Sequence, residues 1–154
     1  MIRERFQPEM SKDTLISIVD DDALARDGIR ELVESLGYKA NTFSSAEHFL
    51  GSDAIGQTAC LITDLQMPGL NGLELQEVLR SKGHRTPIIL ITAYPSENHR
   101  NQALDGGAVG FLSKPLDEAS LIKCLTAAMK LRELHAEGDV DLMAMPTRSL
   151  RNRV

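Results

Sequence analysis

The sequence of 154 residues contains no tryptophan, only two cysteines and few aromatic residues, which make up 4% of the chain. Cys60 and Cys124 lie far apart, each beside apolar residues, so a disulfide framework and a CxxC zinc site are excluded. We expect both to be small buried thiols in a reducing compartment. A chain of this length can bury a core without disulfide or metal staples.

Long apolar runs are also missing, since none reaches the roughly 18 residues needed to span a bilayer. The first ten residues are charged and contain Pro8, which does not fit a signal peptide. These absences predict a cytoplasmic protein that makes no membrane contact.

The net charge of −5 is unevenly placed. Residues 1–13 and 135–154 each hold three basic and three acidic side chains, so the whole acidic excess lies in residues 14–134. An acidic body disfavours a nucleic-acid-binding surface and suits a cation site. We expect one domain over residues 14–134, with an N-terminal appendage at 1–13 and a C-terminal tail at 135–154.

Five short runs of residues predict β-strands. The third and fourth are continuously apolar and rich in β-branched residues, as in strands covered on both faces of a parallel sheet. The second is weaker and is expected near an edge. The runs are residues 15–19, 39–43, 59–63, 87–92 and 108–112.

Helical patterns lie between and after these strands. An apolar stripe from Ala25 to Leu36 predicts the first helix, which Gly37 ends. Ser44 and Glu47 predict a capping box that opens a short helix through residue 50.

Three further helices are expected over residues 73–83, 96–106 and from 117 onward. Ser96 and Asp117 are the predicted N-caps of the last two. The inner face of the last helix is predicted to consist of Leu121, Ile122, Leu125, Ala128 and Met129. Five alternations of strand and helix predict an α/β fold, with a doubly wound five-stranded parallel sheet and helices on both faces.

Polar side chains follow four of the five strands. In a doubly wound sheet the functional residues lie at the carboxyl ends of the strands, so these side chains are expected to converge. They are Asp20, Asp21 and Asp22 after the first strand, Asp64 after the third, Thr92 at the end of the fourth and Lys114 after the fifth.

Clustered carboxylates repel one another and become tolerable when a cation bridges them. Mg²⁺ prefers oxygen ligands and keeps several waters, so two carboxylates and a carbonyl suffice. With a phosphoryl group added, the metal and Lys114 would neutralise its oxygens, Thr92 would bind one of them, and a carboxylate would attack phosphorus.

Four motifs in order resemble the receiver domain of bacterial two-component response regulators. They are IVDDD at 18–22, ITDLQMPG at 62–69, LITA at 90–93 and FLSKP at 111–115. The resemblance covers about residues 14–134 and implies the flavodoxin-like (βα)5 architecture of receivers.

The resemblance also implies a role for each matching residue. Asp64 is the phospho-acceptor, Asp21 is a direct Mg²⁺ ligand and Asp20 acts mainly through water. Asp64 itself and the main-chain carbonyl of Gln66 complete the protein's share of the metal shell.

Thr92 and Lys114 contact the phosphoryl group, and Phe111 matches the switch aromatic, which turns inward when Thr92 is drawn to the phosphate. Pro115 matches a proline that often follows a cis bond. Asp22 is expected to cap the first helix, although a metal pair of Asp21 and Asp22 stays open. Phe111 as a fixed core aromatic also stays open. The histidines at 48, 84, 99 and 135 are expected to be solvated.

The function that the resemblance implies is a phosphorylation-controlled switch, not an enzyme beyond its own phosphorylation and slow dephosphorylation. The expected partners are a histidine kinase or phosphotransfer protein and, through the face formed by residues 96–107, 108–112 and 117–134, a second copy in a homodimer. The opposite charges of this face suit a self-complementary interface.

The output is open at this stage. Residues 136–154 are too few for a helix-turn-helix domain, so a stand-alone receiver is favoured over the receiver part of a longer DNA-binding regulator. Nucleic acid would be contacted only through such an absent output domain. An aspartyl-phosphate hydrolase is disfavoured because Gln66 replaces a second acid, and a flavodoxin-like cofactor binder because acids follow the first strand. A scaffold without phosphorylation is disfavoured by the complete set of acids, threonine and lysine.

Overall fold

The computed structural model describes residues 14–136. Its five strands form one parallel sheet in the order β2-β1-β3-β4-β5, which confirms the predicted α/β class. The elements are β1 (Leu15–Val19), α2 (Ala23–Ser35), β2 (Lys39–Phe43), α3 (Ala46–Leu50), the 3-10 turn η1 (Ile55–Gln57), β3 (Thr58–Asp64), α4 (Gly72–Ser81), β4 (Ile88–Thr92), α5 (Glu97–Asp105), β5 (Gly110–Ser113) and α6 (Glu118–Ala136).

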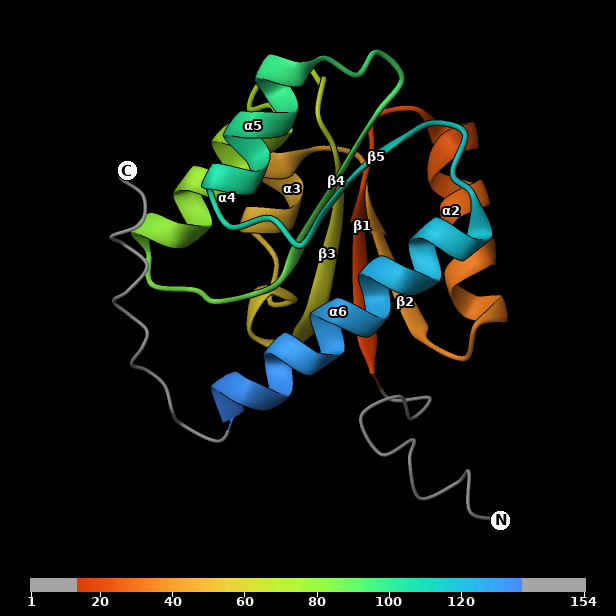
Figure 1. Ribbon diagram of the computed structural model, residues 1–154, viewed down its shortest axis with the longest axis vertical. Helices are drawn as coiled ribbons and strands as arrows, with labels where there is room; N and C mark the ends of the chain where they lie inside the picture. Colours follow the sequence, from red (N-terminus) through yellow and green to blue (C-terminus); the bar gives the residue numbers. More distant parts are fainter. Residues whose placement is uncertain (1–13, 137–154) are drawn as a thin grey trace.

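Helices cover both faces of the sheet (Figure 1). Helices α2 and α6 pack on one face, and α3, α4 and α5 pack on the other. Strands β1, β3 and β4 are buried along their whole length, whereas β2 is half-exposed at one edge as predicted. The last strand begins at Gly110 rather than 108, because the backbone N–H of Ala108 still donates to Ala103 and closes the end of α5.

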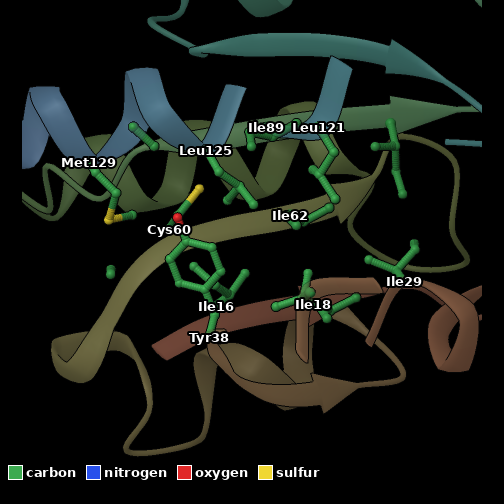
Figure 2. Close-up of a cluster of buried hydrophobic side chains, with 14 residues drawn as sticks. Ile16, Ile18, Ile29, Tyr38, Cys60, Ile62, Ile89, Leu121, Leu125 and Met129 are labelled. Atoms are coloured by element: carbon green, nitrogen blue, oxygen red, sulfur yellow. The ribbon is translucent and has the colours of Figure 1, made fainter. Parts of the chain in front are cut away.

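The core on the α2 and α6 side is almost entirely aliphatic (Figure 2). Isoleucines from β1, β3 and β4 meet Leu121, Leu125 and Met129 of α6. Cys60 is buried there as a free thiol, as expected, and burial raises its pKa. Cys124 is also free but only half-buried, so the expectation of a buried thiol was wrong for this residue.

Two local predictions are corrected. Ser45 rather than Ser44 caps α3, since its side chain accepts from the backbone N–H of His48, and no box with Glu47 forms. Ile122 is not on the inner face of α6 but is 41% exposed. Residue 122 lies about 100° around the helix from the buried Leu121, so it falls on the flank of the packed stripe.

The predicted ends of the other helices agree with the structure. Asp22 caps α2 by accepting from the backbone N–H of Leu24 at 3.3 Å, and Gly37 follows that helix with a φ of 99°. Ser96 caps α5, and Asp117 accepts from the N–H of Ser120 at the start of α6. Within the described part of the chain, no helix is long and apolar enough to cross a membrane.

The close contact between β5 and α6 can be tested by adding a methyl group at Gly110. A Cβ placed on Gly110 would lie 2.4 Å from Sγ of Cys124, whereas a Cβ on Gly28 of α2 would meet nothing within 4 Å. We expect Gly110→Ala to lower the free energy of unfolding by about 1–3 kcal/mol through overpacking. Gly28→Ala should raise it by about 0.5–1 kcal/mol through helix propensity.

Urea unfolding monitored by circular dichroism measures both changes. The added change Cys124→Ala should restore most of the stability lost in Gly110→Ala. Equal stabilities of Gly110→Ala and the wild type would contradict this packing.

Candidate functional site

The acidic residues predicted to converge do so at the carboxyl edge of the sheet. Strands β1 and β3 are neighbours, so Asp20, which follows β1, lies beside Asp64, the last residue of β3. One carboxylate oxygen from each of Asp20, Asp21 and Asp64 lies within 4.8 Å of the other two. Helices lead from these two strands to opposite faces of the sheet, which makes this edge a topological switch point.

Asp20 is completely buried and held on several sides. Its Oδ1 accepts a hydrogen bond from the backbone N–H of Asp22 at 2.9 Å, and its carbonyl accepts from the guanidinium of Arg26 at 2.8 Å. Its Oδ2 lies 2.9 Å from Nζ of Lys114 and forms a buried ion pair with it. Because a carboxylate oxygen has more than one lone pair, Oδ2 can also bind a cation or a metal-bound water.

Lys114 reaches the acids from β5, the far edge of the sheet. Its Nζ lies 3.5 Å from Oδ2 of Asp64, and its backbone N–H donates to the carbonyl of Thr92 at 2.8 Å. The peptide bond between Lys114 and Pro115 is cis. Burial lowers the pKa of Lys114, but hydrogen bonding and charge from Asp20, together with Asp64, outweigh that effect and raise it.

The carboxyl group of Asp64 has a raised pKa and is therefore a weaker acid than usual. Burial, followed by the negative charge of Asp20, raises its pKa to about 6, although Lys114 acts in the opposite direction. The carboxylate is thus poorly compensated by the protein alone. A divalent cation would supply the missing positive charge.

The remaining predicted residues surround this cluster. Thr92 is fully buried at the end of β4, and its Oγ1 accepts from the backbone N–H of Tyr94 at 3.1 Å. Phe111 packs in the core on the side of α4 and α5 and is 9% exposed. Gln66 lies two residues after Asp64, with its side chain exposed.

The adjacent third acid has a different position. Asp22 caps α2 and stays outside the set of close carboxylates formed by Asp20, Asp21 and Asp64. Three carboxylates gathered at one edge of the sheet fit a hard divalent cation that prefers oxygen ligands.

Two residues near the site were missed by the sequence analysis. Arg26 bonds the carbonyl of Asp20, and Glu47 of α3 bonds the backbone of Leu70 in the loop after β3. Each of these contacts is made by an exposed or half-exposed side chain to a backbone group, and no local sequence pattern predicts it.

The raised pKa of Asp64 predicts how stability depends on pH without metal. Folded Asp64 holds its proton up to about pH 6, above the usual value of 3.8 for the unfolded chain. Its contribution to the free energy of unfolding is therefore full below the unfolded pKa and is lost as pH rises through about 6. Asp64→Asn should remove this part of the pH dependence.

Urea unfolding in EDTA between pH 4 and pH 7.5 measures the difference between wild type and Asp64→Asn. In Lys114→Ala the decline should move to higher pH, because Lys114 lowers the pKa of Asp64. If the free energy of unfolding changed with pH in the same way in wild type and Asp64→Asn, the raised pKa of Asp64 would be contradicted.

Comparison with known proteins places this site in a family. The profile of the "Response regulator receiver domain" family matches residues 16–126. The transcriptional regulatory protein TdiR of Thauera aromatica is 34% identical over 122 residues, which cover 79% of this chain and 54% of that protein. The response regulator protein TmoT of Ectopseudomonas mendocina is 37% identical over 129 residues, which cover 82% and 58%.

Solved structures of response regulators are also similar to this chain. The crystal structure of FixJ-N matches with a TM-score of 0.69 and 29% identity over 77% of this chain and 94% of that one. The response regulator StyR matches with a TM-score of 0.75 and 31% identity over 92% and 67%. The chain spans about half the length of the curated relatives it matches. The sequence, the order of its strands and the acidic cluster typical of a receiver Mg²⁺ site lead to one conclusion: the chain belongs to the response regulator receiver domains of two-component signalling systems.

Proposed function

We propose that this chain is a signalling switch that accepts a phosphoryl group on Asp64 from a histidine kinase or phosphotransfer protein. The observation that carries the proposal is the carboxylate of Asp64 within an acidic cluster, 3.5 Å from the ammonium of Lys114. As a receiver, the protein is regulatory rather than an enzyme in the ordinary sense.

Mg²⁺ is the cation we assign to the cluster. Asp20, Asp21, Asp64 and the main-chain carbonyl of Gln66 would hold it, with water completing its shell. When bound, it offsets the negative charge that develops on the phosphoryl oxygens. It also favours the ionised form of Asp64, which is the form able to act as a nucleophile.

The protein's own groups then carry the transfer. A carboxylate oxygen of Asp64 forms a bond to phosphorus while the bond from phosphorus to the donor imidazole nitrogen breaks, and the imidazole leaves with the electron pair and takes up a proton. The ammonium of Lys114 binds one phosphoryl oxygen, and the hydroxyl of Thr92 donates to another. Attack by water later releases inorganic phosphate and restores the carboxylate.

The switch follows from the position of Thr92. Its Oγ1 now accepts from Tyr94, so its hydroxyl hydrogen is available for a phosphoryl oxygen. Movement of Thr92 toward the phosphate would leave space at the end of β4, and Phe111, now 9% exposed, would turn further inward. The hydrogen bond from the backbone N–H of Lys114 to the carbonyl of Thr92 joins the ends of β4 and β5, so both strands would respond together. Phosphorylation would thus favour one of two arrangements of α5, β5 and α6 that already interconvert.

Control of transcription is the output that the relatives favour. TdiR is a transcriptional regulatory protein, and its receiver-like part matches most of this chain. We propose that the phosphorylated face acts on transcription, either through a DNA-binding domain that follows a receiver of this kind or through a partner protein. The chain's location in the cytoplasm belongs to the same proposal.

Labelling by a small phosphodonor tests the acceptor. Incubation with acetyl phosphate and Mg²⁺ should add one phosphoryl group to the wild type, detected by intact mass, and Asp64→Ala should abolish the addition. Lys114→Ala should slow it by about 10²-fold, because a group that stabilises the transition state is lost. EDTA should prevent labelling of the wild type.

Asp53→Ala is the matched control, since it removes an exposed aspartate outside the cluster and should label normally. Undiminished labelling of Asp64→Ala would refute the assignment of the acceptor.

A dimer through α5, β5 and α6 is the form we propose for the active state. Exposed Lys123, Lys130 and Arg132 of α6 could meet exposed Glu97 and Asp105 of α5 from a second copy. Such exposed ion pairs are individually weak, so the dimer should be sensitive to salt and its dissociation constant without phosphate should be micromolar or weaker.

Sedimentation with beryllofluoride as a phosphate mimic should show a shift toward dimer in the wild type. Lys123→Glu should reduce the shift by placing like charges together, and Phe111→Ala should reduce it by uncoupling the switch. A protein that binds the mimic and stays monomeric at high concentration would exclude this interface.

A further inference from the structure

The loop between β3 and α4 is tied to α3 by one exposed side chain. Oε2 of Glu47 accepts a hydrogen bond from the backbone N–H of Leu70 at 2.9 Å. The two residues are 23 positions apart, and the sequence pattern had assigned Glu47 to a capping box that does not form. Its carboxylate thus bonds a different segment from the one expected.

That loop carries Gln66, whose carbonyl we assign to the metal shell. The base of the loop is closed by a hydrogen bond from the N–H of Gly72 to the carbonyl of Leu65 at 2.8 Å. Its far end is ordered by a capping box, in which Asn71 and Glu74 bond each other's backbone N–H groups. The bond from Glu47 holds the part of the loop between these two ends.

Gly69 shows how closely the carboxylate lies against the loop. A Cβ on this residue would lie 2.6 Å from Oε2 of Glu47 and 3.1 Å from Oε1. The φ of Gly69 is 78°, a conformation that residues with a side chain rarely adopt. A glycine here therefore allows both the turn of the loop and the approach of Glu47.

Glu47 is ionised when it makes this contact at neutral pH. The hydrogen bond from Leu70 lowers the pKa of Glu47 from its ordinary value. A charged acceptor makes a stronger hydrogen bond than a neutral one. The contact is solvent-exposed, so its effect is expected on the order of the loop rather than on the stability of the whole fold.

We propose that Glu47 is a positioning residue for the metal and phosphoryl site, because it fixes the loop after Asp64 that carries Gln66, whose carbonyl we assign to the metal shell. The proposal rests on the proposed function, since it concerns the same site. Glu47 touches neither the metal nor the phosphoryl group in this account. It acts by holding the loop in the binding arrangement before the cation arrives.

The effect on metal affinity should be moderate. Loss of a group that bonds directly to a metal ligand typically weakens affinity about 10- to 100-fold. Glu47 bonds the loop four residues beyond Gln66, so we expect Glu47→Ala to weaken Mg²⁺ binding by about three- to tenfold. Glu47→Gln keeps a side-chain oxygen that can accept from Leu70, so it should recover most of the affinity.

Two measurements test the proposal. Calorimetric titration with MgCl2 gives the dissociation constants, and hydrogen exchange of the Leu70 amide in metal-free protein reports the contact itself without any activity. The matched control is Glu34→Ala, which removes an exposed glutamate of α2 that pairs with Arg30 and leaves the loop untouched. We expect faster Leu70 exchange and weaker Mg²⁺ binding in Glu47→Ala only.

The results distinguish the role of Glu47 from the metal site itself. Wild-type exchange and wild-type affinity in Glu47→Ala would overturn the role of Glu47 and leave the proposed function standing. Equal weakening in Glu47→Ala and Glu47→Gln would show an effect of charge alone and would also overturn it. Absence of Mg²⁺ binding by the wild-type protein would overturn both this role and the proposed metal site.

Discussion

Two carboxylates of like charge lie side by side in the interior of this protein, at the ends of β1 and β3. Asp20 is fully buried and Asp64 nearly so, and burial, followed by repulsion from Asp20, raises the pKa of Asp64. Such a pair is tolerated because Lys114 reaches both acids from β5. The strand order makes β1 and β3 neighbours, and β3 ends at Asp64, so the two acids lie side by side. The chain after β5 then brings Lys114 to both of them.

The same lysine joins the acids to the rest of the sheet. Its backbone donates to the carbonyl of Thr92, so a group that binds between Lys114 and Asp64 would act on the ends of β4 and β5 together. Phe111 lies in β5, three residues before Lys114, and packs toward α4 and α5. Asp64 is thus linked through Lys114 and the carbonyl of Thr92 to the strand that carries Phe111.

Much of this arrangement could be predicted from the sequence because it depends on short patterns. Buried parallel strands are continuously apolar, and the polar residue after each one marks the functional edge, so Asp64 and Lys114 were identifiable without coordinates. Competition between neighbours was harder to predict. Ser44 and Ser45 are both serines and so equally suited to cap α3, but the helix begins after Ser45. Leu121 and Ile122 are both apolar, and it is their different angles around α6 that bury the first and expose the second. The bond from Glu47 to Leu70 joins two surface segments through tertiary placement, which no periodicity encodes.

Asp20, Asp21 and Asp64 gather at the ends of β1 and β3 as the proposed cation site, while the next acid, Asp22, caps α2. Titration of the metal-free protein with Mg²⁺, followed by calorimetry at neutral pH, tests it most directly through the adjacent pair Asp21→Asn and Asp22→Asn. We expect one bound ion per wild-type chain, loss of most of the affinity in Asp21→Asn and near-normal binding in Asp22→Asn. Near-normal binding in Asp21→Asn together with loss of binding in Asp22→Asn, or no binding by the wild type, would contradict it.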